Sequence, residues 1–558
     1  MITQDWQWEP IDQQLASLIA AGEPTQENQP LIDAIRILSH QVRQGDVCLL
    51  LADYAGQQIE GYTTPALPEW LAILESSSAV ATSGATTPLI LDDSKRLYFQ
   101  RYWQYEQQLA TALRDRVLNQ PAVLQAALSV DSDKITDLLQ EQTLSEQQKQ
   151  AIVRAIRFPI SIITGGPGTG KTTTIAFLIK ILYQLNPDSC IALAAPTGKA
   201  ATQIQQAISN TVNLSSDRLQ ASTIHRLLGY RPNSVNFRHH ADNPLPYDTV
   251  IIDETSMIDL ALMSKLVNAV KTDARLILLG DADQLVSVET GAVFGELCYN
   301  PEQSVLKNCI TRLQQSYRFA EHPGIGKLAD AVNHGDSDTA LTLLESEQYP
   351  EISWLQPEIT LLDEFFIKHI TDRFKAKLEP QQRLEANNQF QLLCAHRRGR
   401  WGVDGLNQYI EGFLRKQNFI SGQGHYYNGK PIIISCNNYQ LNLFNGDIGL
   451  LAESESGELK AYFSKPDTGI RTISPARLPA YQTAWALTVH QSQGSEFEHV
   501  LLVLPEEISP VLSRELVYTA ITRARKSISI IGTRCILENA ISTRIQRQSG
   551  IAARLSNR

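Results

Sequence analysis

A glycine-rich segment that ends in lysine and threonine is the first place where residue types and spacing suggest chemistry. Within SIITGGPGTGKTTT, residues 161–174, the pattern G-x-x-x-x-G-K-[ST] follows a β-like run and precedes a run with helical spacing. Backbone N–H groups of such a loop face phosphates, the lysine reaches the β- and γ-phosphates, and the hydroxyl reaches Mg²⁺. A glycine-rich turn without a ligand is the alternative. The sequence predicts a site for a nucleoside triphosphate with Mg²⁺, formed by Gly165, Gly166, Pro167, Gly168, Thr169, Gly170, Lys171, Thr172 and Thr173.

Two consecutive acids end the later β-like run VIIDETSM. At the end of a strand, both Asp253 and Glu254 could approach the phosphates. We expect Asp253 to hold Mg²⁺ together with Thr172, and Glu254 to orient and deprotonate an attacking water. An acid pair that only caps the next helix is the alternative. Behind the phosphate loop, the pair favours a hydrolase of ATP over a kinase.

Polar residues after further runs could complete the site. Gln284, in LLGDADQL, is placed to sense the γ-phosphate, and Arg318 follows in QQSYRF. Arg523 and Arg525 lie in VYTAITRARK, much later in the chain. Each arginine alone would more often be a surface or ion-pair residue. Together with the other motifs, they predict a site that Arg318 and Arg523 complete at a cleft between two lobes.

Composition describes the setting of this site. With 558 residues, 43% of them hydrophobic, the chain can form about three to four domains. Its net charge of −10 argues against a surface covered in basic residues, so any nucleic acid contact is expected in a local groove. We found neither a secretory leader nor a run of about 18 apolar residues, and expect a cytoplasmic protein without membrane contact. The seven scattered cysteines form no C-x-x-C pair and are expected to be reduced thiols.

The order of helical and β-like patterns predicts an α/β fold. Residues 1–130 are expected to be mostly helical, with no recognisable chemistry, and to dock a partner. We expect one parallel-sheet lobe over 131–345 and a second over 346–558. Short strands and turns over about 420–480 indicate a small β-barrel inserted in the second lobe. Residues 229–246 suggest a short hairpin that could act as a strand-separating wedge, or else an ordinary connecting loop.

The motifs, in this order and spacing, resemble those of superfamily-one helicases. They include GGPGTGKTTT, LAAPTGKAA, VIIDETSMID, LGDADQL and SYRF. TIHRLLG, LFNGDIG, VHQSQGSEF and RELVYTAITRAR are most similar to the RecD family, the alpha subunits of bacterial exodeoxyribonuclease V, also called RecBCD. The resemblance covers roughly residues 85–555. It implies two RecA-like motor lobes, a helical N-terminal domain and an SH3-like barrel.

The resemblance also implies roles for individual residues. Gln148 would read the adenine, and Gly494 with Glu496 would couple the second lobe to the nucleotide. His225 has a plain alternative as a helix-packing residue, and Gln491 stands where relatives often carry lysine, which would weaken one phosphate contact. The residues implied to line the single-strand groove are Pro196, Thr197, Thr223 and His225 in the first lobe and Thr488, His490 and Ser492 in the second.

The resemblance implies an ATP-dependent 5′→3′ translocase and helicase on single-stranded DNA and duplex ends. It would be the alpha subunit of a RecBCD-type exonuclease complex in double-strand break repair and recombination, with RecB-like and RecC-like partners. Nuclease activity would belong to a partner subunit, since the chain shows no clustered acidic nuclease centre. One alternative is a free-standing RecD-like helicase, although those relatives usually carry a longer N-terminal extension. Another is a regulatory ATPase that binds DNA without translocating.

Overall fold

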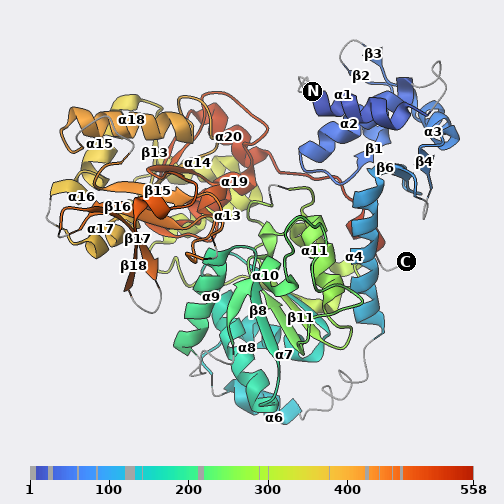
Figure 1. Cartoon of the computed structure of the whole chain (residues 1–558), viewed down its shortest axis with the longest axis horizontal. Coiled ribbons are helices and arrows are strands. Elements are labelled where there is room, and N and C mark those ends of the chain that lie inside the picture. Colours follow the sequence, from blue (N-terminus) through green and yellow to red (C-terminus); the bar gives the residue numbers. More distant parts are fainter. Residues whose placement is uncertain are drawn as a thin grey trace.

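The computed structural model places two parallel sheets side by side, with an N-terminal block beside the first of them (Figure 1). The expected boundary near residue 130 lies outside the described residues. The structure describes residues 8–22, 29–59, 62–82, 86–119, 132–140, 142–211, 219–287, 289–299, 301–375, 378–420, 426–438, 440–454, 456–465 and 469–556.

The first lobe is built on a six-stranded parallel sheet in the order β12-β7-β11-β10-β8-β9. Strands β7, β8 and β10 are buried along their whole length, as expected where helices cover both faces of a parallel sheet. The carboxyl ends of the strands share one edge, where the phosphate loop and the acid pair both lie. Its elements are α6 (Ser132–Gln140), α7 (Glu146–Arg157), β7 (Ile160–Gly165), α8 (Lys171–Leu185), β8 (Ile191–Ala195), α9 (Gly198–Thr211), β9 (Ala221–Thr223), α10 (Ile224–Leu228), β10 (Thr249–Ile252), α11 (Leu260–Ala269), β11 (Arg275–Gly280), α12 (Val293–Cys298) and β12 (Ile310–Leu313).

The second lobe has a five-stranded parallel sheet in the order β13-β22-β21-β14-β20. Helices α13 and α14, which the sequence placed in the first lobe, bury Ile325, Leu328 and Leu341 in the core of this second sheet. The change of lobe therefore comes after β12, not at residue 345. Its elements are α13 (Pro323–His334), α14 (Ser337–Glu345), β13 (Ile352–Leu355), α15 (Ile359–His369), α16 (Asp372–Lys375), α17 (Pro380–Asn387), β14 (Phe390–Cys394), α18 (Val403–Lys416), β20 (Ala486–Thr488), β21 (Phe497–Val503), α19 (Arg514–Ile521), β22 (Ala524–Ile531) and α20 (Arg534–Ser542).

A separate antiparallel sheet, in the order β18-β17-β16-β15-β19, is inserted between α18 and β20. Ile432, Leu451 and Phe463 form its small core. In the described part of the chain the end strands β18 and β19 do not pair with each other, so the closed SH3-like barrel stays a prediction. The strands are β15 (Lys430–Ile434), β16 (Ile448–Glu453), β17 (Leu459–Lys465), β18 (Gly469–Ile473) and β19 (Tyr481–Thr483).

The N-terminal block is mainly helical, and it also contains a four-stranded sheet, β1-β6-β5-β4, that helical spacing did not indicate. Its last helix, α4, buries Leu109 and Leu113 in the core of the first lobe. Helix α4 therefore packs as part of the first lobe, and the docking of a partner by the block stays a prediction. Its elements are α1 (Pro10–Ala20), α2 (Gln29–Arg43), β1 (Leu49–Leu50), β2 (Gln58–Ile59), β3 (Tyr62–Thr63), α3 (Leu67–Ser76), β4 (Val80–Ala81), β5 (Leu89–Leu91), β6 (Arg96–Phe99) and α4 (Gln100–Leu118).

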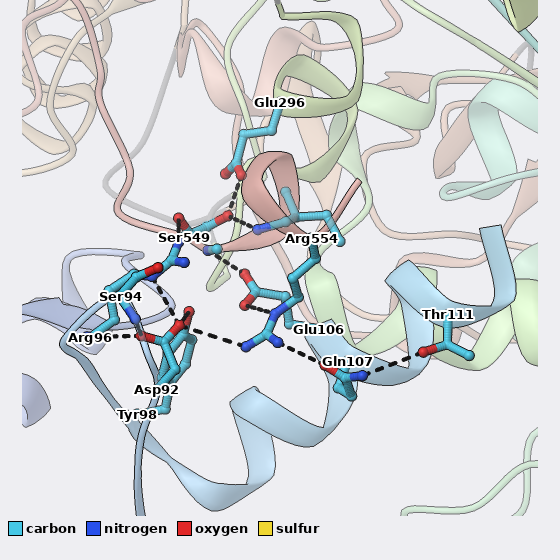
Figure 2. Close-up of polar contacts among 12 residues, drawn as sticks. Asp92, Ser94, Arg96, Tyr98, Glu106, Gln107, Thr111, Glu296, Ser549 and Arg554 are labelled. Atoms are coloured by element: carbon cyan, nitrogen blue, oxygen red, sulfur yellow. Dashed lines mark hydrogen bonds and ion pairs between the residues drawn. The ribbon is translucent and has the colours of Figure 1, made fainter. Parts of the chain in front are cut away.

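The C-terminal segment, residues 543–556, leaves the second lobe after α20 and runs back to α4 and the first lobe (Figure 1). Its short helix α21 (Ile551–Arg554) is held by Glu106 of α4, whose carboxylate accepts from the Gly550 N–H at 2.6 Å and from Arg554 Nε at 3.0 Å. Figure 2 shows this cluster, in which Ser549 also donates to Glu296 of α12. The segment joins three parts of the molecule, so the second-lobe prediction for 346–558 was wrong at its end.

Residues 229–246 form an irregular loop and not a pair of strands. The Arg238 N–H donates to Gly229 O and the His239 N–H to Leu228 O, both at 2.9 Å, so the loop folds back on the end of α10. Asn233, with φ +58°, makes a turn in this loop. The segment therefore matches the connecting-loop alternative, and the β-hairpin prediction was wrong.

No helix in the described part of the chain is long and apolar enough to cross a membrane. All seven cysteines are free. Burial raises the pKa of Cys298 and of Cys309 to about 12, so both are protonated thiols at neutral pH.

Candidate active site and nucleic-acid interface

The phosphate loop joins the end of β7 to the start of α8, as the motif predicts. Gly168 and Gly170 have φ of +77° and +80°, a left-handed conformation that side chains rarely adopt. A Cβ atom on Gly168 would lie 2.3 Å from the Cβ of Arg318, so glycine is also required by close packing. Lys171 Nζ donates to Gly165 O at 2.5 Å and to Gly166 O at 3.1 Å. The ammonium group therefore lies against the loop that would hold the phosphates.

Gln148 touches this loop from the preceding helix. It forms a capping box with Ser145 at the start of α7, and its amide Nε2 donates to Thr169 O at 3.3 Å. Only 5% of the residue is exposed. The side chain is thus held beside the nucleotide loop, and the reading of adenine by Gln148 stays a prediction.

The acid pair lies where β10 ends. Asp253 Oδ1 accepts from the Glu254 N–H at 2.9 Å, and the left-handed φ of Glu254, +51°, breaks the strand alternation at this point. Desolvation, reinforced by the neighbouring Glu254, raises the pKa of Asp253 to about 6 against the opposing charge of Lys171. The charge of Lys171 offsets burial and Glu254 only in part, so this carboxylate favours a bound cation.

The groups present fit a magnesium ion. Mg²⁺ prefers oxygen ligands and usually binds through one or two protein oxygens together with phosphates and water. Thr172 at the start of α8 and Asp253 at the end of β10 supply a hydroxyl and a carboxylate. Among the described residues, Asp253 makes no ion pair that would already neutralise it. When bound, the ion would neutralise phosphate charge.

Gln284 follows β11 and is buried, with 5% of its surface exposed. Its amide Nε2 donates at 2.9 Å to Asp281, the residue directly after the strand. Asp281 was missed in the sequence, although it follows the apolar run RLILLG just as Asp253 follows TVII. The strand-end position was the available signal.

Arg318 links the phosphate loop to the second lobe. The Tyr317 N–H beside it donates to Gly168 O at 2.9 Å, which fixes this segment against the loop. The Arg318 guanidinium pairs with Glu496 and donates to Thr522 O at 3.3 Å. Burial alone would raise the pKa of Glu496, but the charges of Arg318 and Arg525 lower it below its ordinary value. Glu496 is therefore an ionised bridge at the boundary between the lobes.

Arg523 is buried in the second lobe, with 4% of its surface exposed. Its Nε donates to Thr519 O at 3.2 Å and its Nη1 to Ser495 O at 3.3 Å. Both partners belong to the second lobe, so the structure holds this guanidinium within its own lobe. Arg525, in contrast, is 61% exposed and pairs with Glu496 at 3.0 Å.

A cavity of about 410 Å³ opens between the lobes beside this bridge. Lys199, Ser495, Glu496 and Arg525 are among its lining residues. Lys199, of the PTGKAA motif, bonds through Nζ to Ser495 Oγ across the lobe boundary, and burial lowers its pKa to about 8. A larger cavity, of about 740 Å³, is lined in part by Gln284 and lies between the first lobe and the C-terminal segment.

The predicted DNA residues of the first lobe lie after β8 and around α10. Pro196 and Thr197 follow β8, and Thr197 Oγ1 accepts from the Ala200 N–H at 3.2 Å near the start of α9. Thr223 is buried and caps α10 through the Arg226 N–H at 3.3 Å. His225 is exposed, and its ring lies edge-on to Phe237 at 5.6 Å between centroids. Of these side chains, His225 is the one most open to a strand.

The predicted DNA residues of the second lobe follow β20. Thr488 Oγ1 donates to Gln491 Oε1 at 3.2 Å and accepts from the Gln491 N–H at 3.1 Å, so Gln491 is used to hold this turn. His490 is partly exposed. Ser492 is fully buried, and its hydroxyl donates to Val489 O at 2.7 Å. The structure therefore does not place the Ser492 hydroxyl at a surface that DNA could reach.

Comparison with known proteins adds three family matches and several relatives. Residues 4–98 match the family described as RecBCD enzyme subunit RecD, N-terminal domain; residues 148–290 match an AAA domain; and residues 483–531 match the UvrD-like helicase C-terminal domain. The chain is 36% identical over 539 residues to the RecBCD enzyme subunit RecD of Mycolicibacterium smegmatis, covering 94% of this chain and 93% of the relative. It is 35% identical over 529 residues to the Haemophilus influenzae subunit, covering 83% of this chain and 80% of the relative.

A relative of another kind is the ATP-dependent RecD2 DNA helicase of Deinococcus radiodurans. It is 32% identical over 437 residues, which is 77% of this chain and 54% of the relative. This match leaves almost half of the relative without a counterpart, whereas the matches to the RecBCD subunits extend over most of both chains.

Proposed function

Because this chain belongs to the family of the RecBCD enzyme subunit RecD, we propose that it hydrolyses ATP between its lobes to move 5′→3′ along single-stranded DNA. The chain is an ATP-dependent DNA helicase of RecBCD type. Mg²⁺ held by Thr172 and Asp253 is part of the proposal, as are the roles given to the individual site residues.

The observation that carries the proposal is the ion pair between Arg318 and Glu496. Arg318 packs on the phosphate loop, and Glu496 lies in the second lobe. Binding or loss of a γ-phosphate at that loop would change the charge next to Arg318, and the ion pair passes this change to the second lobe. Relative movement of the lobes is how hydrolysis becomes displacement along a strand.

The residues of the site divide the work. Lys171 would neutralise phosphate charge, and Glu254 would accept a proton from the attacking water. Arg523 would supply positive charge where it develops during transfer, as the lobes close. Because two carbonyl oxygens hold Arg523 in its own lobe, closure must carry the whole end of α19 toward the phosphates.

RecB-like and RecC-like subunits are the proposed partners, and duplex ends are the proposed substrate of the complex. The support is the extent of the match to RecBCD subunits, which includes the N-terminal block. The match covers 93% of the Mycolicibacterium smegmatis subunit but only 54% of the RecD2 helicase. This difference favours the complex over a free-standing helicase.

The test is ATP turnover by the purified chain with and without single-stranded DNA, followed by unwinding of a duplex with a 5′ tail. The proposal expects stimulation by DNA and ATP-dependent strand separation. ATP turnover with DNA binding but without strand separation would favour the non-translocating regulatory ATPase instead.

A further inference from the structure

Tyr518 of α19 extends from the second lobe into the first. Only 6% of the residue is exposed, and its hydroxyl donates to Asp281 Oδ2 at 3.2 Å. Asp281 directly follows β11 of the first lobe. The next residue of the helix, Thr519, accepts from the Leu285 N–H at 2.9 Å. Two consecutive residues of α19 thus hold the loop that contains Gln284.

The Asp281 carboxylate organises this loop. Oδ1 accepts from the Asp283 N–H at 3.1 Å, and Oδ2 accepts from Gln284 Nε2 at 2.9 Å as well as from Tyr518. Only 2% of Asp281 is exposed, so these bonds replace water at a buried acid. Because its amide is bonded to Asp281, the Gln284 side chain has a fixed direction. Loss of one donor would leave the buried Asp281 carboxylate with fewer hydrogen bonds.

The same hydroxyl lies against the phosphate loop. A Cβ atom on Gly166 would come within 2.9 Å of the Tyr518 oxygen. Burial, and then the charge of Asp281, raises the pKa of Tyr518 well above its ordinary value, so the hydroxyl keeps its proton and acts as the donor. Tyr518 therefore stands between the phosphate loop and the glutamine expected to sense the γ-phosphate.

The positions of Tyr518 and Arg523 both depend on α19. Arg523 Nε donates to Thr519 O, so the guanidinium is attached to the turn of α19 that carries Tyr518. A displacement of Asp281 relative to α19 would therefore change the position of Arg523. A displacement of Arg523 would in turn change the position of Gln284.

We propose that Tyr518 is a positioning residue, which holds Asp281 and through it Gln284 so that γ-phosphate sensing in the first lobe is joined to Arg523 in the second. This inference rests on the proposed ATPase function. In this role Tyr518 acts through Asp281; it sets the direction of Gln284 and ties that direction to the position of α19.

The test is Tyr518→Phe in the full chain, which removes one hydroxyl and keeps the buried ring. The measurements are kcat and KM for ATP at saturating single-stranded DNA, together with binding of a fluorescent ATP analogue. The expected result is a kcat lower by roughly 10- to 100-fold, the range for one hydrogen bond to a charged group. KM and the analogue Kd should stay within about threefold, because the bond orients a group and does not hold the nucleotide.

A matched control is Tyr409→Phe. Tyr409, on α18, also donates to a carboxylate, Asp363 Oδ1, at 2.9 Å, but within the second lobe. The Tyr409→Phe variant should have the same kcat for ATP as the wild type. The second measurement is a double-mutant cycle with Asp281→Ala: if Tyr518 acts through Asp281, Tyr518→Phe changes kcat by less than about twofold in that background.

Three results would overturn the inference: a Tyr518→Phe kcat within about twofold of wild type, an equal further loss in the Asp281→Ala background, or a loss that appears only as a raised KM. A wild-type chain without DNA-stimulated turnover would overturn the proposed function, and this inference with it. A wild-type chain with full stimulation, accompanied by an unaffected Tyr518→Phe, would overturn this inference alone.

Discussion

Replacement of Arg554 by methionine tests how firmly the C-terminal segment is fixed to the first lobe. Glu106, its partner, has a side chain with 0% exposure, and Arg554 Nε lies 3.0 Å from its carboxylate. Methionine keeps most of the apolar stem but leaves the buried carboxylate without its cation. Breaking a buried pair in this way costs about 3–5 kcal/mol. This free energy should be lost from the docking of residues 546–556 on α4, because Glu106 also accepts from the Gly550 N–H.

Two amides outside the segment report its docking. The Val47 N–H donates to Gln548 O at 2.8 Å, and the Val305 N–H donates to Leu555 O at 2.9 Å. If undocking is what exposes them, Arg554→Met should speed hydrogen exchange at both by roughly 10²–10⁴, the factor that corresponds to the lost free energy of about 3–5 kcal/mol. Peptides that contain these amides can be followed by mass spectrometry.

The control for this experiment is Arg534→Met. Arg534 is 53% exposed, pairs with Glu345 and Glu538 at the surface, and should leave exchange at Val47 and Val305 unchanged. Adding Glu106→Gln to Arg554→Met should restore much of the protection, since the uncompensated charge is then absent. Unchanged exchange in Arg554→Met would refute the reasoning and show that the apolar contacts of α21 hold the segment alone.

Three further predictions concern the nucleotide site. Lys171→Gln should abolish ATP turnover while melting near the wild-type temperature, because the ammonium bonds to carbonyl oxygens of its own loop and not to another element; a near wild-type rate would contradict the phosphate-loop assignment. Arg523→Ala should lower kcat by about 10³–10⁵, the range for arginine fingers, and leave affinity for an ATP analogue within roughly tenfold; loss of binding as well would make Arg523 a ground-state ligand. Asp253→Asn should stop turnover and yet raise the free energy of unfolding at pH 7.5 by about 1–3 kcal/mol. The reason is that the pKa of Asp253 is raised to about 6, so above that pH the ionised carboxylate destabilises the folded chain. This gain should shrink as the pH falls below about 6, and an equal gain at pH 5 and 7.5 would be inconsistent with it.

Local sequence predicted the strands and loops of the motor well. Apolar runs such as ISIIT and TVII are buried strands, and the loop between Gly165 and Lys171 needs glycine for reasons that the motif already contains. Such features depend on a few adjacent residues, so their spacing identifies them.

Features that depend on distant parts of the chain were missed. The packing of α13, α14 and α21 depends on which sheet accepts their apolar faces, and helical spacing does not specify the partner. Tyr518 was overlooked for the same reason. Its hydroxyl gains a role only because Asp281, 237 residues earlier, lies across the lobe boundary.

The most direct test of the motor is displacement of streptavidin from biotinylated single-stranded DNA by the purified full chain. A 5′→3′ translocase moves toward the 3′ end, so ATP should release streptavidin from a 3′-biotinylated strand much faster than from a 5′-biotinylated one. The Lys171→Gln variant should release neither. ATP-dependent release from the 5′ end, or rapid ATP turnover on DNA without release from either end, would contradict the account.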